Sequence, residues 1–220
     1  MGSMMTTETY QPFLMSKLAR RLDVRFIGAV PGRYTFPDRK AVPKDGVEVY
    51  ACRLCSISTR TAVLVALGRP ELGESITANF EHFGIIHAKA TRYLPNGFAM
   101  DLVMTDEDRA KLAEQIKWQK RKARTQEPDK REHPRIQPRD PCTVLSFADG
   151  THVPCFVIDV SQSGAAVSAS ILPGRGTPVA IGGLIGRVVR RLDVGFAVQF
   201  TEVHELAKLD RLLAPPARAQ

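Results

Sequence analysis

A short motif occurs twice in this chain, once near the end of each half. Residues 96–102 read NGFAMDL and residues 194–200 read VGFAVQF. A hydrophobic stretch that ends in basic residues precedes each copy, at 85–92 and at 184–191. A repeat of roughly 100 residues has the length of a domain, whereas solenoid repeats are about 20–50 residues long. The chain is therefore predicted to contain two related domains in tandem.

Between these landmarks the chain is built of short segments rich in Val, Ile, Thr and Phe. Gly, Pro, Asn and Asp separate them, and strands spaced by turns in this way are typical of a small barrel or sandwich. In the second half we expect strands at 152–160, 165–171, 186–191 and 196–200. The predicted fold is mainly β, with two tandem small β-barrels that are each followed by a C-terminal α-helix.

The two helices are indicated by capping and by spacing. Thr105 is a suitable N-cap, and Asp106 and Glu107 place acidic side chains in the first turn that follows. Near the end of the chain, Leu206 and Leu209 lie at helical spacing, as do Leu209 and Leu213. Each domain is therefore expected to close with one helix.

Positive charge is concentrated between the two halves. The chain has a net charge of +8, and residues 116–140 contain nine Lys and Arg against four Asp and Glu. Three prolines in this stretch interrupt regular structure. It is expected to be a helix tail that continues into a basic linker, either simply solvated or a site for anions. The expected division is a tail at 1–19, a degenerate domain at 20–118, a linker at 119–130, a domain with the ligand motif at 131–214 and a tail at 215–220.

Composition excludes several classes of protein. A hydrophobic content of 44% and a charged content of 25% are ordinary for globular chains, which argues against wholesale disorder or a collagen-like chain. No apolar run of about 18 residues predicts a membrane span. The polar start does not resemble a signal peptide, so a cytoplasmic location is expected. Residues 1–3 are interpreted as a remnant of cloning.

Neither a metal site nor a catalytic site is indicated. Among the four cysteines only Cys52 and Cys55 are close in sequence, and their segment is predicted to be a strand. We expect buried, reduced thiols and no bound metal. The sequence contains no helical metal-binding histidine pair, no phosphate-binding loop and no nucleophile elbow. The protein is therefore expected not to be an enzyme and to need no cofactor.

The second half carries two short patterns in a fixed order. Arg131 and Arg135 form an Arg-x-x-x-Arg pattern, and Asp159, Ser161 and Gly164 form Asp-x-Ser-x-x-Gly. Either pattern alone is weak. Together, ahead of the GFAV strand, they resemble the PilZ family, whose members bind the bacterial second messenger cyclic di-GMP. The resemblance covers roughly residues 128–213, and residues 20–118 are similar only through the repeat.

The resemblance implies a role for each matching residue. Arg131 and Arg135 hold phosphate and guanine, while Asp159, Ser161 and Gly164 form the wall of the site. Lys130, just before the first arginine, is a possible accessory residue that influences whether one or two stacked ligand molecules bind. The family further implies a bacterial receptor that regulates motility, exopolysaccharide or another surface behaviour through a protein partner.

The residue types suit this ligand chemically. A guanidinium group binds phosphate oxygens in a bidentate manner and can also stack on a purine. A carboxylate such as that of Asp159 accepts hydrogen bonds from the N–H groups on a guanine edge. Gly164 has no Cβ, so a ligand or the arginine segment can approach its backbone closely. Ligand clamping by residues 131–139 is expected to reorient the first domain.

The first half departs from the pattern. Aligning Ser58 with Ser161 puts Ser56 at the position of Asp159 and Thr61 at the position of Gly164. The acceptor carboxylate and the residue without Cβ are both lost, although Arg21 and Arg25 keep the arginine spacing. We predict a degenerate domain that does not bind the nucleotide and instead holds the second domain, a partner or another copy of the chain.

Two other functions are compatible with the sequence. Residues 117–124 combine basic side chains with Trp118, which could stack on a base in a nucleic-acid-binding protein. Against this, Trp118 is expected to pack on its own barrel. Affinity carried by such residues would fall steeply with ionic strength. The third possibility is a protein-interaction module with a vestigial ligand site, which would fold normally without binding the dinucleotide.

Overall fold

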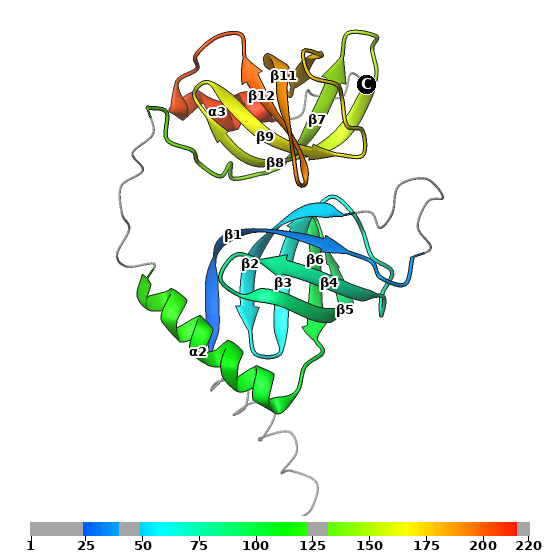
Figure 1. The fold of residues 1–220 in the computed structure, drawn as a ribbon, viewed down its shortest axis with the longest axis vertical. Helices are drawn as coiled ribbons and strands as arrows, with labels where there is room; N and C mark the ends of the chain where they lie inside the picture. Colours follow the sequence, from blue (N-terminus) through cyan, green and yellow to red (C-terminus); the bar gives the residue numbers. More distant parts are fainter. Residues whose placement is uncertain (1–23, 40–48, 123–131, 215–220) are drawn as a thin grey trace, which may run out of the picture.

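The computed structural model describes residues 24–39, 49–122 and 132–214, and Figure 1 shows two barrels stacked along the long axis of the molecule. The first barrel comprises β1 (Arg25–Thr35), β2 (Tyr50–Ser58), β3 (Thr61–Ala66), β4 (Ser75–Phe80), β5 (Gly84–Leu94) and β6 (Gly97–Leu102), followed by α2 (Asp106–Lys122). The second comprises β7 (Cys142–Phe147), β8 (His152–Ser161), β9 (Gly164–Ala169), β10 (Pro178–Ile181), β11 (Leu184–Leu192) and β12 (Gly195–Phe200), followed by α3 (Leu206–Leu213).

The two barrels have the same topology. The strands close in the order β1-β2-β3-β6-β5-β4 in the first barrel and in the corresponding order β7-β8-β9-β12-β11-β10 in the second. The repeated Gly-Phe-Ala sequences begin β6 and β12, which occupy equivalent places. The strands predicted in the second half are all present, with ends within two residues of the expected positions. The predicted fold class is confirmed.

Each barrel has its own hydrophobic core. Alternating residues point inward, as in β3 and β4, because successive side chains of a strand face opposite sides. Phe98 is fully buried in the first barrel, and its counterpart in the repeat, Phe196, is fully buried in the second. Leu112 and Ile116 of α2 join the first core, and Leu209 and Leu213 of α3 join the second. The helices therefore complete the cores rather than stand apart from them.

Helix α2 starts where the sequence predicted it, after Thr105. The Oγ1 atom of Thr105 accepts a hydrogen bond from the backbone N–H of Asp108 at 3.2 Å, which is an N-cap interaction. The helix continues to Lys122 and so includes the first four residues of the range 119–130 that is expected to be a linker. Gln, Lys and Arg are good helix formers and no proline interrupts this stretch. Residues 123–131 lie outside the described part of the chain.

Trp118 does not pack into its barrel, contrary to the expectation. Its side chain is 48% exposed, whereas Gln119 is buried because it continues the inward stripe of Leu112 and Ile116. The indole ring makes an edge contact with His82, with ring centroids 6.2 Å apart. The Nζ atom of Lys122 lies 5.1 Å from the indole centroid. Trp118 therefore lies on the outer face of α2, beside basic side chains.

The first barrel contacts the second through β2 and through the segment ahead of β7. Arg53 of β2 is buried, and its Nη1 atom donates a hydrogen bond to the carbonyl oxygen of Pro138 at 2.6 Å. Its Nη2 atom is buried and has no hydrogen-bond partner among the described residues. Burial lowers the pKa of the Arg53 guanidinium. Nearby, Asn96 Nδ2 donates to Asp140 Oδ2 at 3.2 Å.

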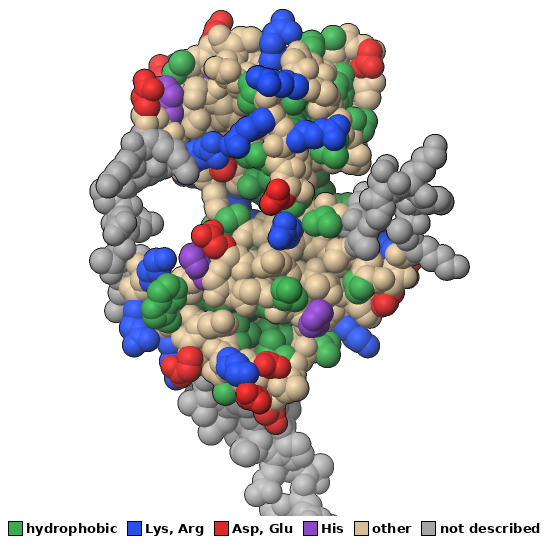
Figure 2. Space-filling model, in the orientation of Figure 1, with side chains coloured by type: hydrophobic (Ala, Val, Ile, Leu, Met, Phe, Trp, Pro, Cys, Tyr) green, Lys and Arg blue, Asp and Glu red, His purple; other side chains and the backbone are tan. Residues whose placement is uncertain are grey.

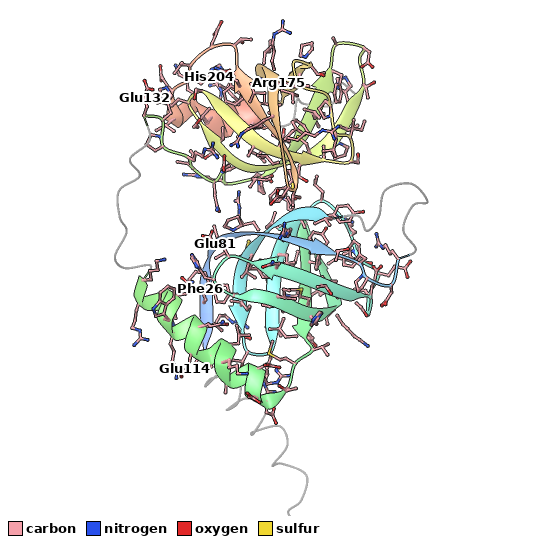
Figure 3. All side chains as sticks on the ribbon, in the orientation of Figure 1. Phe26, Glu81, Glu114, Glu132, Arg175 and His204 are labelled. Carbon is pink, nitrogen blue, oxygen red and sulfur yellow. The ribbon has the colours of Figure 1, made fainter. Side chains whose placement is uncertain are left out.

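A cleft of about 570 Å³ lies between the barrels. Arg33 and Glu81 line it from the first barrel, and Figure 3 labels Glu81 on the side that faces the second barrel. Arg190, Arg191 and Asp193 line it from the β11–β12 hairpin. Figure 2 shows basic side chains along this part of the second barrel. An ion pair between Arg33 and Asp193, at 3.9 Å, joins the two walls.

All four cysteines are free thiols. Cys52 and Cys155 are buried as expected, whereas Cys55 and Cys142 are half-buried. Burial, reinforced by the carboxylate of Asp140, raises the pKa of Cys142 to about 11. Within the three described ranges, no group of His, Cys, Asp and Glu side chains is arranged to hold a metal ion. In the same residues no helix is long and apolar enough to cross a membrane.

Candidate functional site

The segment ahead of β7 is fixed to the end of β8 by a short antiparallel bridge. The N–H of Ile136 donates to the carbonyl oxygen of Val160 at 2.8 Å, and the N–H of Val160 donates to that of Ile136 at 2.9 Å. His133 Nδ1 lies 3.0 Å from Gln162 Oε1, which ties the same segment to the β8–β9 turn. Arg135 is thereby held beside the β8–β9 hairpin.

Arg135 and Asp159 form an ion pair at this position. The Nη1 atom of Arg135 donates to Oδ2 of Asp159 at 3.2 Å, and their side chains are 40% and 28% exposed. A bulge between Val157 and Asp159 changes the register of β8 just before the carboxylate. A half-exposed pair of this kind contributes little to folding stability. Its more important effect is to hold a guanidinium group and a carboxylate side by side.

Ser161 and Gly164 close the hairpin opposite each other. Ser161 is buried, and its Oγ atom donates to the carbonyl oxygen of Gly164 at 3.3 Å. A Cβ added at Gly164 would lie 2.5 Å from the carbonyl oxygen of Val198 in β12. The close approach of β12 therefore requires a glycine here, which is a structural reason that the sequence analysis did not foresee.

These residues surround one hollow of about 280 Å³ on the second barrel. Arg135, Asp159, Ser161 and Gly164 all line it, so four of the five predicted site residues come together in space. Arg131 and the accessory Lys130 lie outside the described residues. The remaining lining residues come from β9, from β11 and β12 and from the β8–β9 turn: Ser163, Ala165, Ala166, Val189, Arg190, Leu192, Ala197, Val198 and Gln199.

Sequence reasoning missed the contribution of β11, above all Arg190. The basic end of this strand was noted only as part of the repeat. Arg190 lines the same hollow as Asp159 because β12 and β9 connect β11 to β8 in the closed barrel. The one sequence signal for this role of Arg190 is its position at the end of an amphipathic strand.

The first barrel contains a counterpart of this site that lacks the carboxylate. Ser56 pairs with Val63 after a bulge, as Asp159 pairs with Ala166 after a bulge in the second barrel. Arg25 Nη1 donates to Ser56 Oγ at 3.3 Å, and Arg25 Nη2 donates to Thr61 Oγ1 at 3.2 Å. The alignment predicted from sequence is confirmed. In this barrel the arginine contacts hydroxyl groups instead of a carboxylate.

Comparison with solved structures finds chains that align over most of the length of this one. MrkH of K. pneumonia, solved as a complex with c-di-GMP, is 13% identical, with 94% of this chain and 90% of that chain covered and a TM-score of 0.26. The inhibitor of motility MotI/DgrA of Bacillus subtilis is 11% identical, with coverages of 86% and 93% and a TM-score of 0.28. YcgR of Escherichia coli, in complex with c-di-GMP, is 14% identical, with coverages of 96% and 92% and a TM-score of 0.23.

Comparison with curated proteins gives no match. A family model described as PilZ domain matches residues 129–214. This match covers β7 to β12, helix α3 and the segment that carries Arg135. It also includes Arg131 and both patterns on which the sequence resemblance rests. The part of the chain that the PilZ domain model matches is therefore the second barrel, which carries the hollow formed by Arg135, Asp159, Ser161 and Gly164.

Proposed function

We propose that this protein is a bacterial cyclic di-GMP receptor that binds the dinucleotide in the hollow of its second barrel. The observation that carries the proposal is the convergence of Arg135, Asp159, Ser161 and Gly164 on one hollow within a PilZ domain. Cyclic di-GMP offers two phosphates and two guanines, which suit the cation and the acceptor groups present. The proposal includes a cytoplasmic location, a receptor without catalytic activity and no cofactor.

Ligand binding must break the ion pair between Arg135 and Asp159. In the structure, Arg135 and Asp159 satisfy each other at 3.2 Å. Binding exchanges this contact for two others, because the guanidinium turns to a phosphate and the carboxylate accepts from a guanine edge. Neither group has to travel far, and both remain partly solvated before binding, so the cost of separating them is small. Arg131 supplies the second guanidinium of the clamp.

The arginine segment also supports a role in coupling the domains. Arg135 lies close in sequence to Pro138, whose carbonyl oxygen accepts the hydrogen bond from Arg53 of the first barrel. Clamping of residues 131–139 on the ligand therefore pulls on a contact between the barrels. We propose that the first barrel does not bind the nucleotide and changes its position when the second barrel does. The output is regulation of motility or exopolysaccharide through a protein partner.

Calorimetric titration with cyclic di-GMP tests the proposal. We expect binding to the wild-type chain, and at least about 100-fold weaker binding to an Arg131→Ala/Arg135→Ala variant, since two charge-assisted contacts are lost. The matched control is Arg21→Ala/Arg25→Ala, which removes the same arginine spacing from the first barrel and should bind like the wild type. Absence of binding by folded wild-type protein would refute the receptor function.

One observation supports the alternative function, binding of nucleic acid. Trp118 is 48% exposed, with the ammonium group of Lys122 near its ring, which is an arrangement suited to stacking on a base. If this function were correct, a Trp118→Ala variant would lose affinity for single-stranded nucleic acid, and wild-type affinity would fall steeply with salt. The receptor proposal instead predicts that Trp118→Ala leaves cyclic di-GMP binding unchanged.

A further inference from the structure

Four residues of the second barrel lie in one row across four neighbouring strands. Asp159 of β8 pairs with Ala166 of β9, which pairs with Ala197 of β12, which pairs with Arg190 of β11. Directly paired residues of antiparallel strands project on the same face of the sheet. The row therefore places a carboxylate at one end, a guanidinium group at the other and two methyl groups between them.

The same row forms the floor of the hollow. All four residues line it, and Arg135 lies beside Asp159 at one end. Three strand spacings separate Asp159 from Arg190, which is roughly 14 Å. Alanine is the smallest side chain that still covers the backbone, so the centre of the row stays low and apolar. A flat aromatic ring can lie on this floor while charged groups reach it from both ends.

Arg190 is placed at the edge of the floor by a second bulge. The register of β11 shifts between Val188 and Arg190, as that of β8 shifts between Val157 and Asp159. A bulge redirects the side chains that follow it. Both charged ends of the row thus lie directly after a bulge.

The guanidinium group of Arg190 is available for a ligand. The side chain is exposed, and among the described residues it has no hydrogen bond or ion pair. Two arginines nearby differ in this respect. Arg135 is paired with Asp159, and Arg187 on the same strand donates to the carbonyl oxygen of Gly176 at 3.3 Å.

We propose that Arg190 is a further ligand-binding residue, which binds phosphate oxygens of the cyclic dinucleotide at the end of the hollow opposite Arg135. This inference rests on the proposed function and adds a third arginine to the two of the Arg-x-x-x-Arg pattern. Because the ligand has two phosphates related by its own symmetry, a single cationic end leaves one phosphate solvated. Arg190 supplies the second cationic end, and its planar fork suits a phosphate group.

The test is titration of cyclic di-GMP into the full chain carrying Arg190→Ala, Arg190→Lys or Arg187→Ala. We expect about tenfold weaker binding for Arg190→Ala and a smaller loss for Arg190→Lys, since lysine keeps the charge but not the fork. Arg187→Ala, on the same strand but outside the hollow, should bind like the wild type. The slope of affinity against salt concentration should also become shallower in Arg190→Ala alone.

The outcomes separate this inference from the proposed function. Unchanged binding by Arg190→Ala, together with loss of binding by Arg131→Ala/Arg135→Ala, overturns the inference and leaves the receptor function standing. Absence of binding by the folded wild-type chain overturns both. Circular dichroism and a thermal melt check folding, which replacement of Arg190 should not affect because its side chain is exposed and has no partner among the described residues.

Discussion

The two barrels share a frame but differ in the residues placed on it. In the second barrel the row across the sheet reads Asp159, Ala166, Ala197 and Arg190, and in the first it reads Ser56, Val63, Ala99 and Arg92. Bulges occur at corresponding places in β2 and β8 and in β5 and β11. The far arginine and one alanine occur in both rows. The carboxylate and the second alanine are found only in the second barrel.

This comparison shows that fold and site depend on different residues. Both barrels have the buried phenylalanine and the closely packed glycine of the Gly-Phe-Ala copies, and both have the bulges. The proposed site needs a carboxylate and a low floor in addition, and only two substitutions along the row separate the barrels in this respect. Function in such a pair lies in side chains grafted onto a common scaffold.

Removing the carboxylate should have the largest effect. Asp159→Ala is expected to weaken cyclic di-GMP binding by about 10- to 150-fold, because a hydrogen bond to a charged group contributes about 1.5–3 kcal/mol. Ser56→Ala, the matched change in the first barrel, should leave binding unaltered. Titration calorimetry measures both, and equal effects of the two changes would contradict the division of roles between the barrels.

Raising the floor should have a smaller effect. Ala166→Val transfers the residue of the first barrel, Val63, to the second and adds two methyl groups under the ligand. We expect roughly tenfold weaker binding, which corresponds to about 1.4 kcal/mol and lies within the usual cost of overpacking. Thermal melts should show whether the fold is affected. Unchanged affinity would mean that the ligand does not lie on this floor.

The smallest predicted effect concerns a pair on the first barrel. Arg39 donates to both carboxylate oxygens of Glu74, at 2.7 and 2.9 Å, and this contact holds the pKa of Glu74 below its usual range. A carboxyl whose pKa is lower in the folded than in the unfolded protein stabilises the fold above its unfolded pKa, near 4.3, and loses that contribution as the pH falls through the folded value.

Glu74→Gln should therefore lower the stability of the chain at pH 7 by about 1 kcal/mol or less, since Arg39 is partly exposed. The difference between variant and wild type should shrink once the pH falls below about 4. Denaturant unfolding at several pH values measures it. A difference that stayed constant down to pH 3 would show that the ion pair is not its cause.

Much of the fold followed from the repeat. The Gly-Phe-Ala copies, the Thr105 cap and the spacing of Leu206 and Leu209 are local signals, and the elements that they predicted are present. The sequence analysis predicted the wrong orientation for Trp118 because either of two adjacent residues of α2, Trp118 or Gln119, could face the barrel. Composition alone favours the aromatic residue, whereas the helical phase set by Leu112 and Ile116 selects Gln119.

The site was predictable only in part. Asp159 and Ser161 are close in sequence, and the family pattern joins them to Arg135, so their meeting was expected. Arg190 reaches the same hollow only because β12 and β9 connect β11 to β8 in the closed barrel. Bulges in β8 and β11 bring Asp159 and Arg190 into the row across the sheet. A bulge cannot be recognised reliably from the alternation of polar and apolar residues in the sequence. The need for glycine at position 164 likewise depends on a strand that is distant in sequence.

Under the proposed function, the buried Arg53 affects how strongly the protein responds to the dinucleotide. One of its terminal N–H groups is buried without a partner among the described residues, which costs about 1–3 kcal/mol. Separation of the barrels returns this group to water, so the docked arrangement is favoured by less than its contacts alone suggest. When the free-energy difference between two arrangements is small, a modest difference in their affinity for the ligand is enough to reverse their populations. The concentration at which half of the molecules respond is then set partly by Arg53, which does not line the hollow, as well as by the residues that touch the ligand.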